Sequence, residues 1–425
     1  MTTIALVGGG VSVSSLLEEL AIALPSEDVR LRLVAQDVER TRALAEHGRH
    51  LVAGRPRWQV EACGTLADAV TGADVVVLML RVGGLEARRA DEARSRAFGI
   101  PGDEGLGPGG AANAMRTLPV IDELAQDLLR LAPRATVLNL VAPLGLTTRV
   151  LLDRGVDAVG VCELPLLTER SLSAVLDDVE LAYAGFNHLG WFWPVDAPDE
   201  PRPDAVELLA PAVAARLVDR EVLERYGAAA LKYHYWLHDP AAADRLGIGR
   251  DPGRTDALID LRDEARDEIA SHPDRRCDAV LARPTPWFRD ALVPMLAAWL
   301  GGPAWSGYAN VANGPLVPDF DPDLVVEVPV RIDDHGIVAR PLTATQPPAA
   351  LAFSRRVERS EVLLHEAWRS GAPTAVEDSF VEGPHHLDRS TARELARAIA
   401  EDRDLGPGTV EHEPASTAGP TGAAT

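Results

Sequence analysis

The chain is 425 residues long, with 46% hydrophobic and 25% charged residues, a composition typical of a globular protein with two or three structural units. Its formal net charge is −22, and a surface this acidic repels nucleic-acid phosphates, which argues against a nucleic-acid partner. The three cysteines do not make a disulfide framework, and no apolar stretch reaches the length needed to span a bilayer. We therefore expect a cytoplasmic protein with neither nucleic acid nor membrane as a partner.

The first 160 residues alternate between predicted strands and helices. Unbroken apolar runs of this kind are typical of parallel strands that are covered on both faces. Predicted strands lie at 4–7, 29–34, 73–80, 135–141 and 158–162, and predicted helices at 11–24 and 42–51. This alternation of strands and helices predicts an α/β fold with a Rossmann-like, doubly wound parallel sheet.

The pattern after residue 165 is mixed, which predicts a second, α+β domain. Predicted helices lie at 205–225, 256–271, 288–300 and 350–370, and a predicted hairpin pairs 323–332 with 336–341. From residue 406 the chain is rich in Gly, Pro, Ala, Ser and Thr without apolar periodicity, which predicts a disordered tail. We thus expect three segments: a Rossmann-like domain at 1–165, a mixed α+β domain at 166–405 and the tail at 406–425.

Gly8, Gly9 and Gly10 lie between the first predicted strand and the first predicted helix. Glycines here let the backbone approach a pyrophosphate at the helix N-terminus, and the position at the first βα turn favours a dinucleotide site over a plain tight turn. Asp37 follows the second strand, where an acidic residue accepts the adenine ribose hydroxyls. An equally supported interpretation makes Asp37 the N-cap of the next helix.

Two arginines, Arg81 and Arg88, follow the third predicted strand, so they lie near the carboxyl edge of the sheet, where open α/β folds bind ligands. They can clamp an anionic group through forked hydrogen bonds, or they can be solvated surface residues. The stretch 102–110 contains five glycines. This composition predicts a flexible loop whose backbone comes close to a ligand or cofactor.

Cys162 ends the last predicted strand of the first domain, and His188 lies further along the chain. Each alone is more often a structural residue. Together, a cysteine and a histidine can bind a soft or borderline divalent metal whose remaining positions are filled by substrate oxygens.

In their order along the chain, these motifs resemble glycoside hydrolase family 4, the NAD- and divalent-metal-dependent enzymes typified by 6-phospho-glucosidases. The motifs are VGGG at 7–10, RVGGLEAR at 81–88, GPGG at 107–110, RTLP at 116–119, Cys162, NHL at 187–189 and NG at 313–314. The likeness runs from about residue 3 to about residue 370. It implies a glycosidase that transiently oxidises C3 of a sugar or sugar phosphate with NAD⁺, eliminates the aglycone and adds water, with a divalent metal such as Mn²⁺ on the C2 and C3 oxygens.

The resemblance also implies roles for particular residues. It makes the first domain the NAD-binding domain and the second the substrate, metal and oligomerisation domain of a homodimer or homotetramer. Cys162 and His188 fall on the metal ligands. The other implied residues are Gly8, Gly9, Gly10, Asp37 and Arg81 for NAD, Glu104 as a catalytic residue in the substrate and metal pocket, and Arg81, Arg88, Ala142, Glu163, Asn187 and Asn310 or Asn313 for the substrate.

The chain departs from the family pattern at several places. Ala142-Pro143 replaces Asn-Pro, Arg283-Pro284-Thr285 replaces Arg-Gly-Gly, and Glu163 follows the metal cysteine in place of the Asn common in phospho-glucosidases. A carboxylate at 163 disfavours a substrate phosphate nearby and suits an unphosphorylated or amino sugar.

The most serious departure concerns the catalytic base, because Ala230 stands at the place of the family's tyrosine. Tyr233 and Tyr235, with His234 between them, can supply a substitute; the alternative is that they form an aromatic core stripe. Three interpretations follow: a glycosidase, an NAD-dependent sugar oxidoreductase or epimerase that has lost net hydrolysis, and a non-catalytic nucleotide sensor.

Overall fold

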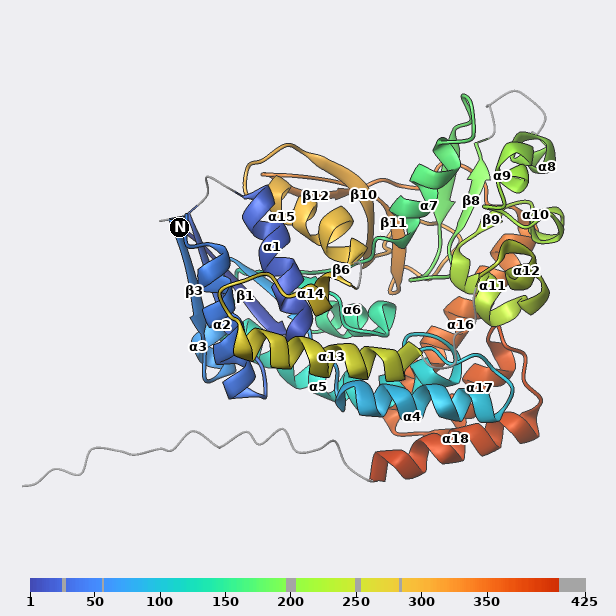
Figure 1. Ribbon diagram of the computed structural model, residues 1–425. Coiled ribbons are helices and arrows are strands. Elements are labelled where there is room, and N and C mark those ends of the chain that lie inside the picture. Colours follow the sequence, from blue (N-terminus) through green and yellow to red (C-terminus); the bar gives the residue numbers. More distant parts are fainter. Residues whose placement is uncertain (25–27, 56, 196–203, 249–253, 283–284, 405–425) are drawn as a thin grey trace, which may run out of the picture.

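A nine-stranded sheet forms the centre of the computed structural model, which describes residues 1–24, 28–55, 57–195, 204–248, 254–282 and 285–404 (Figure 1). The strand order is β12-β11-β10-β6-β5-β4-β1-β2-β3. The strands are β1 (Thr2–Gly8), β2 (Val29–Val34), β3 (Trp58–Ala62), β4 (Val75–Met79), β5 (Thr136–Asn139), β6 (Ala158–Val161), β10 (Trp305–Ala312), β11 (Val325–Asp333) and β12 (Gly336–Ala339). The predicted tail at 406–425 and the pair Arg283-Pro284 lie outside the described residues.

The six strands β1 to β6 are parallel and have the Rossmann order 3-2-1-4-5-6. This order confirms the predicted doubly wound sheet. The sequence analysis missed β3, a short strand that is half exposed along its length. The predicted hairpin is confirmed as β11 and β12, which pair antiparallel.

Helices cover both faces of the sheet and bury two apolar cores against it. One core contains residues of α1 (Val13–Ala23), α2 (Val38–Leu51), α13 (Arg254–Ser271), α14 (Asp278–Leu281), η2 (Trp287–Leu292) and α15 (Val293–Trp299). The other contains residues of α3 (Leu66–Val70), α5 (Gly107–Leu131), α6 (Leu144–Asp153), α16 (Pro348–Ser370), α17 (Pro373–Glu382) and α18 (Arg389–Asp404). Segments after residue 165 therefore pack on the large sheet, and β10, β11 and β12 extend it, so the sheet contains strands from both sides of the predicted domain boundary. The predicted division into domains stays a prediction.

The glycine-rich stretch at 102–110 is only partly a loop. Helix α5 begins at Gly107, which corrects the predicted flexible loop. The glycines serve close packing, since a Cβ on Gly109 would lie 2.2 Å from the Asp103 carbonyl oxygen and one on Gly110 would lie 2.5 Å from the Gly105 carbonyl carbon. Helix α4 (Gly84–Ala97) precedes this stretch and α7 (Leu164–Ser173) follows β6.

A small second sheet, β7-β8-β9, lies with short helices at the end of the molecule opposite β3 (Figure 1). Its elements are β7 (Leu181–Ala184), β8 (Trp191–Pro194), β9 (Ala229–Ala230), α8 (Ala205–Leu208), α9 (Ala210–Ala214), α10 (Arg220–Tyr226), α11 (Lys232–His238) and α12 (Pro240–Leu246). The single helix predicted at 205–225 is thus wrong, because Pro211 and the N-cap Asp219 start new helices. The N–H of Glu327 in β11 donates to the Gly185 carbonyl (2.9 Å), which ties the small sheet to the large one.

None of the described helices is long and apolar enough to cross a membrane.

Candidate active site

The Gly8-Gly9-Gly10 turn joins β1 to the 3-10 turn η1 (Gly10–Ser12), which leads into α1. All three glycines have left-handed φ values of 87°, 92° and 53°, which L side chains rarely adopt. A Cβ on Gly8 would lie 2.8 Å from Leu80 Cα, whereas a Cβ on Gly10 would meet nothing within 4 Å. Gly8 therefore permits close strand packing, and Gly10 leaves open space at the helix N-terminus, a cradle that fits a dinucleotide pyrophosphate.

Asp37 is the N-cap of α2, as one of its two interpretations predicted. Its carboxylate accepts a hydrogen bond from the Arg40 N–H at 2.9 Å. The side chain is 48% exposed. Its position after β2 leaves the ribose role as a prediction.

The two predicted metal ligands lie in one polar cluster at the carboxyl end of β6. Cys162 directly follows β6 and is buried. Asn187, the neighbour of His188, interacts with the Cys162 thiol by a hydrogen bond that acts to lower its pKa, but burial and the charges of Glu327 and Glu163 raise the pKa of this thiol well above its usual value. The uncharged thiol is thus the stable form at neutral pH in the absence of a cation.

His188 has the backbone conformation of a strained site residue, with φ at 129°. Its Nδ1 atom is buried and has no hydrogen-bond partner among the described residues. Burial lowers the pKa of the imidazole to about 4, so the ring is neutral at pH 7 and its free nitrogen can donate a lone pair.

Tyr233 stacks on His188, with ring centroids 4.5 Å apart and planes 3° from parallel. Burial and the charge of Asp103 raise the pKa of its hydroxyl to about 12, while Arg254 acts in the opposite direction. Tyr233 is therefore a protonated phenol beside the predicted metal ligand. The structure does not bring Tyr235 to this cluster: Tyr235 is 1% exposed and packs in the core with Trp191 and Phe353. A catalytic role for Tyr235 stays a prediction, and this packing does not support it.

Glu104 lies between the two predicted substrate arginines. Arg81 donates to both of its oxygens, from Nε (2.8 Å) and Nη2 (3.0 Å), and Arg88 Nη1 donates to Oε1 (2.7 Å). Burial acts to raise the pKa of Glu104, but Arg81 and Arg88 outweigh it and lower the pKa to about 2. Glu104 is thus a carboxylate held by two arginines, and its role as a catalytic residue of the substrate and metal pocket stays a prediction.

Arg88 is 4% exposed and also donates from Nε to Glu92 (2.7 Å). Its Nε and Nη1 atoms are bound to Glu92 and Glu104, and its predicted contact with the substrate stays a prediction. Arg81, with 37% of its side chain exposed, still faces solvent at this edge.

The loop that carries Glu104 is fixed to the end of β5. The Asn113 amide donates to the carbonyl oxygens of Glu104 (2.9 Å) and Ala142 (3.0 Å). Ala142 therefore contributes its backbone to the wall of this edge, and its methyl group can form no hydrogen bond to a sugar hydroxyl.

Three charged residues that sequence reasoning did not assign to the site, Asp103, Lys232 and Arg254, lie near Tyr233. Asp103 is 6% exposed, and burial raises the pKa of its carboxyl to about 6 despite the hydrogen bond from the Gly105 N–H. Lys232 is exposed, and burial of part of its side chain together with Arg254 lowers its pKa. Glu163 acts on Lys232 in the opposite direction, and burial raises the pKa of Glu163 itself. Asp103 lies within the predicted glycine-rich loop and Lys232 is next to Tyr233 in the sequence. The motifs therefore indicated the segments that contain these residues, but not what their side chains do.

Asn187 and Asn310 meet at a buried carboxylate, Glu327. Both amides donate to Glu327 Oε1, from Asn187 at 3.2 Å and from Asn310 at 2.9 Å. Asn313 instead turns its amide into its own loop, where it donates to the carbonyls of Val317 and Phe320 (both 3.1 Å). The prediction that Asn313 binds substrate is thus corrected, because a fully buried amide with these partners organises the turn.

A two-residue donor set fits a divalent metal only in part. Cys162 supplies a thiolate once a cation displaces its proton, and His188 supplies an unpartnered, neutral Nδ1. Among the described residues there is no group of three or more His, Cys, Asp or Glu side chains that could hold a metal. The arrangement suits a borderline metal whose other positions are open to substrate oxygens.

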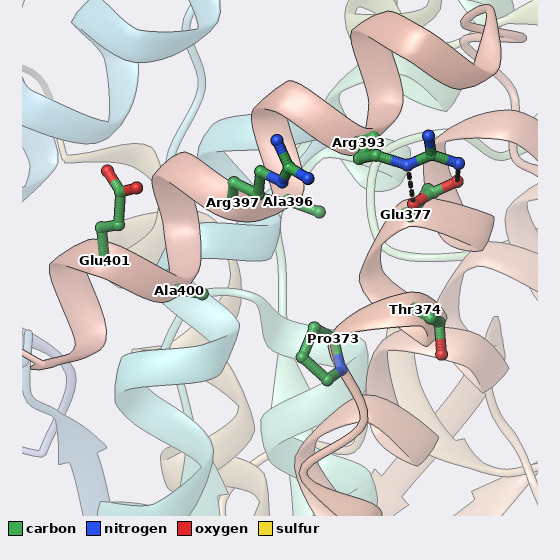
Figure 2. Close-up of a pocket in the computed structure, with 8 residues that line it drawn as sticks. All are labelled: Pro373, Thr374, Glu377, Arg393, Ala396, Arg397, Ala400 and Glu401. Atoms are coloured by element: carbon green, nitrogen blue, oxygen red, sulfur yellow. Dashed lines mark hydrogen bonds and ion pairs between the residues drawn. The ribbon is translucent and has the colours of Figure 1, made fainter.

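A surface groove of about 380 Å³ lies between α17 and α18, away from these residues (Figure 2). It is lined by Pro373, Thr374, Glu377, Arg393, Ala396, Arg397, Ala400 and Glu401. Its Arg393–Glu377 ion pair is already satisfied (Nε to Oε2, 3.2 Å), and none of these residues takes part in the polar cluster.

The chain is similar to curated glycosidases over part of its length. It is 38% identical over 127 residues to a probable 6-phospho-beta-glucosidase of Bacillus subtilis (28% of this chain, 29% of that protein). It is 33% identical over 199 residues to a 6-phospho-beta-glucosidase of Thermotoga maritima (44% and 46%). It is 29% identical over 209 residues to an alpha-galacturonidase of Bacillus subtilis (44% and 45%). The matched region spans less than half the length of each of these relatives.

Two solved structures resemble the fold over nearly the whole chain. The 6-phospho-beta glucosidase of Thermotoga maritima has a TM-score of 0.79 at 20% identity, over 95% of this chain and 99% of that one. A 6-phospho-alpha-glucosidase from gut microorganisms, in complex with NAD and Mn²⁺, has a TM-score of 0.76 at 21% identity, over 96% and 99%. At these identities the likeness shows the shared fold.

Two family models cover most of the chain. The model of family 4 glycosyl hydrolases matches residues 3–178, and the model of the C-terminal domain of the same family matches residues 183–385. This chain therefore belongs to glycosyl hydrolase family 4.

Proposed function

We propose that the chain is an NAD- and divalent-metal-dependent glycosidase that acts on a sugar or sugar-phosphate glycoside by transient oxidation at C3, elimination and hydration. The observation that carries the proposal is the cluster of Cys162, His188 and Tyr233 at the carboxyl end of β6, within a family 4 chain. A related structure of the same fold contains NAD and Mn²⁺. We also propose a cytoplasmic location and a homodimeric or homotetrameric assembly.

The Gly8-Gly9-Gly10 turn would hold the pyrophosphate of NAD. Its backbone N–H groups and the N-terminal end of α1 supply the positive electrostatic potential that a pyrophosphate needs. Asp37 is exposed after β2, where its carboxylate favours the ribose hydroxyls of NAD and repels the 2′-phosphate of NADP.

Cys162 and His188 would hold the divalent metal, Mn²⁺ in preference to Mg²⁺ because a thiolate is a poor ligand for a hard ion. When bound, such a metal supplies Lewis-acid stabilisation of negative charge on the sugar oxygens.

Tyr233 is the residue of this chain best placed to take the proton from C2 of the sugar, since its ring lies on the His188 ring. Its pKa near 12 makes it a weak base alone. Nearby positive charge favours the phenolate, and Arg254 already acts in that direction.

The substrate end of the site carries charges of both signs. Arg81 and Lys232 are its exposed cations, and Glu163 lies close enough to Lys232 to affect its pKa. An anionic sugar substituent, whether a phosphate or a carboxylate, can pair with Arg81 or Lys232. The carboxylate of Glu163 favours the smaller charge of a carboxylate or a neutral hydroxyl over a phosphate.

A second candidate function is an NAD-dependent sugar oxidoreductase or epimerase. It is favoured by Ala230, a buried methyl group in β9 at the place where the family's catalytic tyrosine is expected. With a weaker base, oxidation at C3 would proceed without elimination of the aglycone.

A panel of chromogenic glycosides, each with and without a 6-phosphate, separates the two functions. A glycosidase releases aglycone with no net change in NADH absorbance, an oxidoreductase accumulates NADH, and an epimerase regenerates NAD⁺ and releases no aglycone. We expect activity to vanish with chelator, to return with Mn²⁺, and to fall by about 10²-fold or more in Cys162→Ser and His188→Ala. NAD⁺ binding in both variants should be unchanged, because the dinucleotide turn lies on another strand. Full activity in chelated protein or in either variant would contradict the proposal.

A further inference from the structure

A fully buried carboxylate lies behind the proposed metal ligands. Glu327 is in the middle of β11 and 0% exposed. Tyr183 Oη donates to its Oε2 at 2.5 Å, and Asn310 and Asn187 donate to its Oε1. Cys162 also interacts with this carboxylate through a hydrogen bond.

All side-chain donors to Glu327 are uncharged. No lysine or arginine in the described part of the chain forms an ion pair with it, whereas Glu104, whose side chain is 20% exposed, has two arginines. A buried carboxylate without a cation is costly to the fold. Such a group is retained where the charge serves a ligand or a reaction.

Two of the side-chain partners of Glu327, Cys162 and Asn187, come from the segments that carry the proposed metal ligands. Cys162 ends β6, and Asn187 precedes His188 in the turn between β7 and β8. The turn is strained at His188, and its N–H donates to the Phe186 carbonyl (2.5 Å). Two side-chain hydrogen bonds of Asn187, one to Glu327 and one to Cys162, fasten this turn to the large sheet.

We propose that Glu327 is a positioning residue for the metal, a role that rests on the proposed metal site at Cys162 and His188. It holds the Cys162 end of β6 and the Asn187–His188 turn at a fixed separation, and its negative charge offsets the cation. A divalent cation, one thiolate and one carboxylate carry no net charge together, so a bound metal compensates the charge of Glu327 that no described lysine or arginine pairs with. Outer carboxylates that orient metal ligands act in this way in metalloproteins generally.

A purely structural role for Glu327 makes a different prediction. The carboxylate would then only tie β7 and β10 to β11, and its loss would lower thermal stability without changing affinity for a metal. Metal affinity therefore distinguishes the two roles, and it can be measured without substrate, NAD or turnover.

The test is Mn²⁺ binding to the full chain, measured by calorimetry and by the electron paramagnetic resonance signal of free Mn²⁺. Glu327→Gln keeps the shape and one oxygen for the two asparagines but removes the charge, and we expect its Mn²⁺ affinity to fall by about 10- to 100-fold. The matched control is Tyr183→Phe, which removes a hydrogen bond to the same carboxylate and leaves its charge; we expect its affinity to stay within a few-fold of wild type.

Each outcome supports or overturns the role. Equal Mn²⁺ affinity in wild type and Glu327→Gln overturns the inference alone, whereas absence of Mn²⁺ binding in wild type overturns the proposed metal site and the inference with it. If Glu327→Gln does not fold, Asn187→Ala replaces it, since it cuts the link between Glu327 and the His188 turn. Unchanged Mn²⁺ affinity in folded Asn187→Ala, with unchanged NAD⁺ affinity, overturns the inference as well.

Discussion

Two enclosed carboxylates, Glu104 and Glu327, lie at the same edge of the sheet and are held in opposite ways. Glu104 accepts hydrogen bonds from Arg81 and Arg88, which lower its pKa to about 2 against the effect of burial. Glu327 accepts hydrogen bonds from neutral groups only, and burial raises its pKa to about 7. The same residue type is thus permanently charged in one place and poised to change its charge in the other.

The contrast lies in where the compensating charge comes from. At Glu104 the positive charge comes from two arginines of the chain itself. At Glu327 no lysine or arginine of the described residues supplies it, and Cys162 is one of its hydrogen-bond partners. Arg88, in the RVGGLEAR stretch, likewise pairs with Glu92 and Glu104, and Arg81 is the more exposed of the two arginines.

Glu104→Ala should give the largest change in stability. It leaves Arg88 buried with Glu92 alone and removes both hydrogen bonds to Arg81. Removal of one partner from a buried ion pair costs about 3–5 kcal/mol, and because Glu92 remains we expect about 3 kcal/mol in the free energy of unfolding, measured with urea.

The matched control for this variant is Asp256→Ala. Asp256 pairs with Arg89 at 3.3 Å, but both side chains are more than half exposed, so its loss should cost less than about 1 kcal/mol. Equal losses in the two variants would show that the Glu104 cluster is not a buried ion-pair network.

The pH dependence of stability should have opposite signs at the two carboxylates. The pKa of Glu104 falls from 4.5 to about 2 in the fold, so its contribution is present above pH 4.5 and is lost as the pH falls toward 2. The pKa of Glu327 rises from 4.5 to about 7, so in metal-free protein its contribution is present below pH 4.5 and is lost as the pH rises through 7. Each shift corresponds to about 3 kcal/mol.

Urea unfolding of metal-free protein across this pH range, repeated with Glu104→Gln and Glu327→Gln, measures both effects. In Glu104→Gln the free energy of unfolding should depend less on pH below pH 4.5. In Glu327→Gln it should depend less on pH between pH 4.5 and 7. Identical profiles in wild type and Glu327→Gln would show that Glu327 has the same charge in the folded and unfolded chain.

The sequence was sufficient for the parallel sheet, because unbroken apolar runs and a glycine turn are local signals. The order of the motifs, through its resemblance to the family, also predicted that Cys162 and His188 lie in one site. It was not sufficient for the orientation of side chains. Tyr233 and Tyr235 are two residues apart in α11 and therefore point to different sides of the helix, and only tertiary packing decides which one meets His188.

Pairings between distant segments were equally out of reach. Glu327 and Asn187 are 140 residues apart in the chain, and no local pattern marks a glutamate in a strand as a hydrogen-bond centre. Asn313 shows the reverse error: its Asn-Gly motif matches the family, but its amide is used within its own loop. Motifs thus located the neighbourhood of the site, and the fold determined which of its polar atoms are free.

Arg81→Lys should give the smallest effect of the three changes, because it alters only the exposed side of the Glu104 cluster. Lysine keeps the charge beside Glu104 but cannot reproduce the two parallel hydrogen bonds that Arg81 Nε and Nη2 make to it. The side chain is 37% exposed, so we expect little change in stability.

If Arg81 also contacts the sugar's anionic or polar end, loss of a charged hydrogen bond should raise KM by about 10- to 100-fold, equivalent to about 1.5–3 kcal/mol, with a smaller change in kcat. Arg89→Lys, at an exposed position of α4 paired with Asp256, is the matched control and should leave KM unchanged. An unchanged KM in Arg81→Lys would mean that Arg81 serves only to hold Glu104.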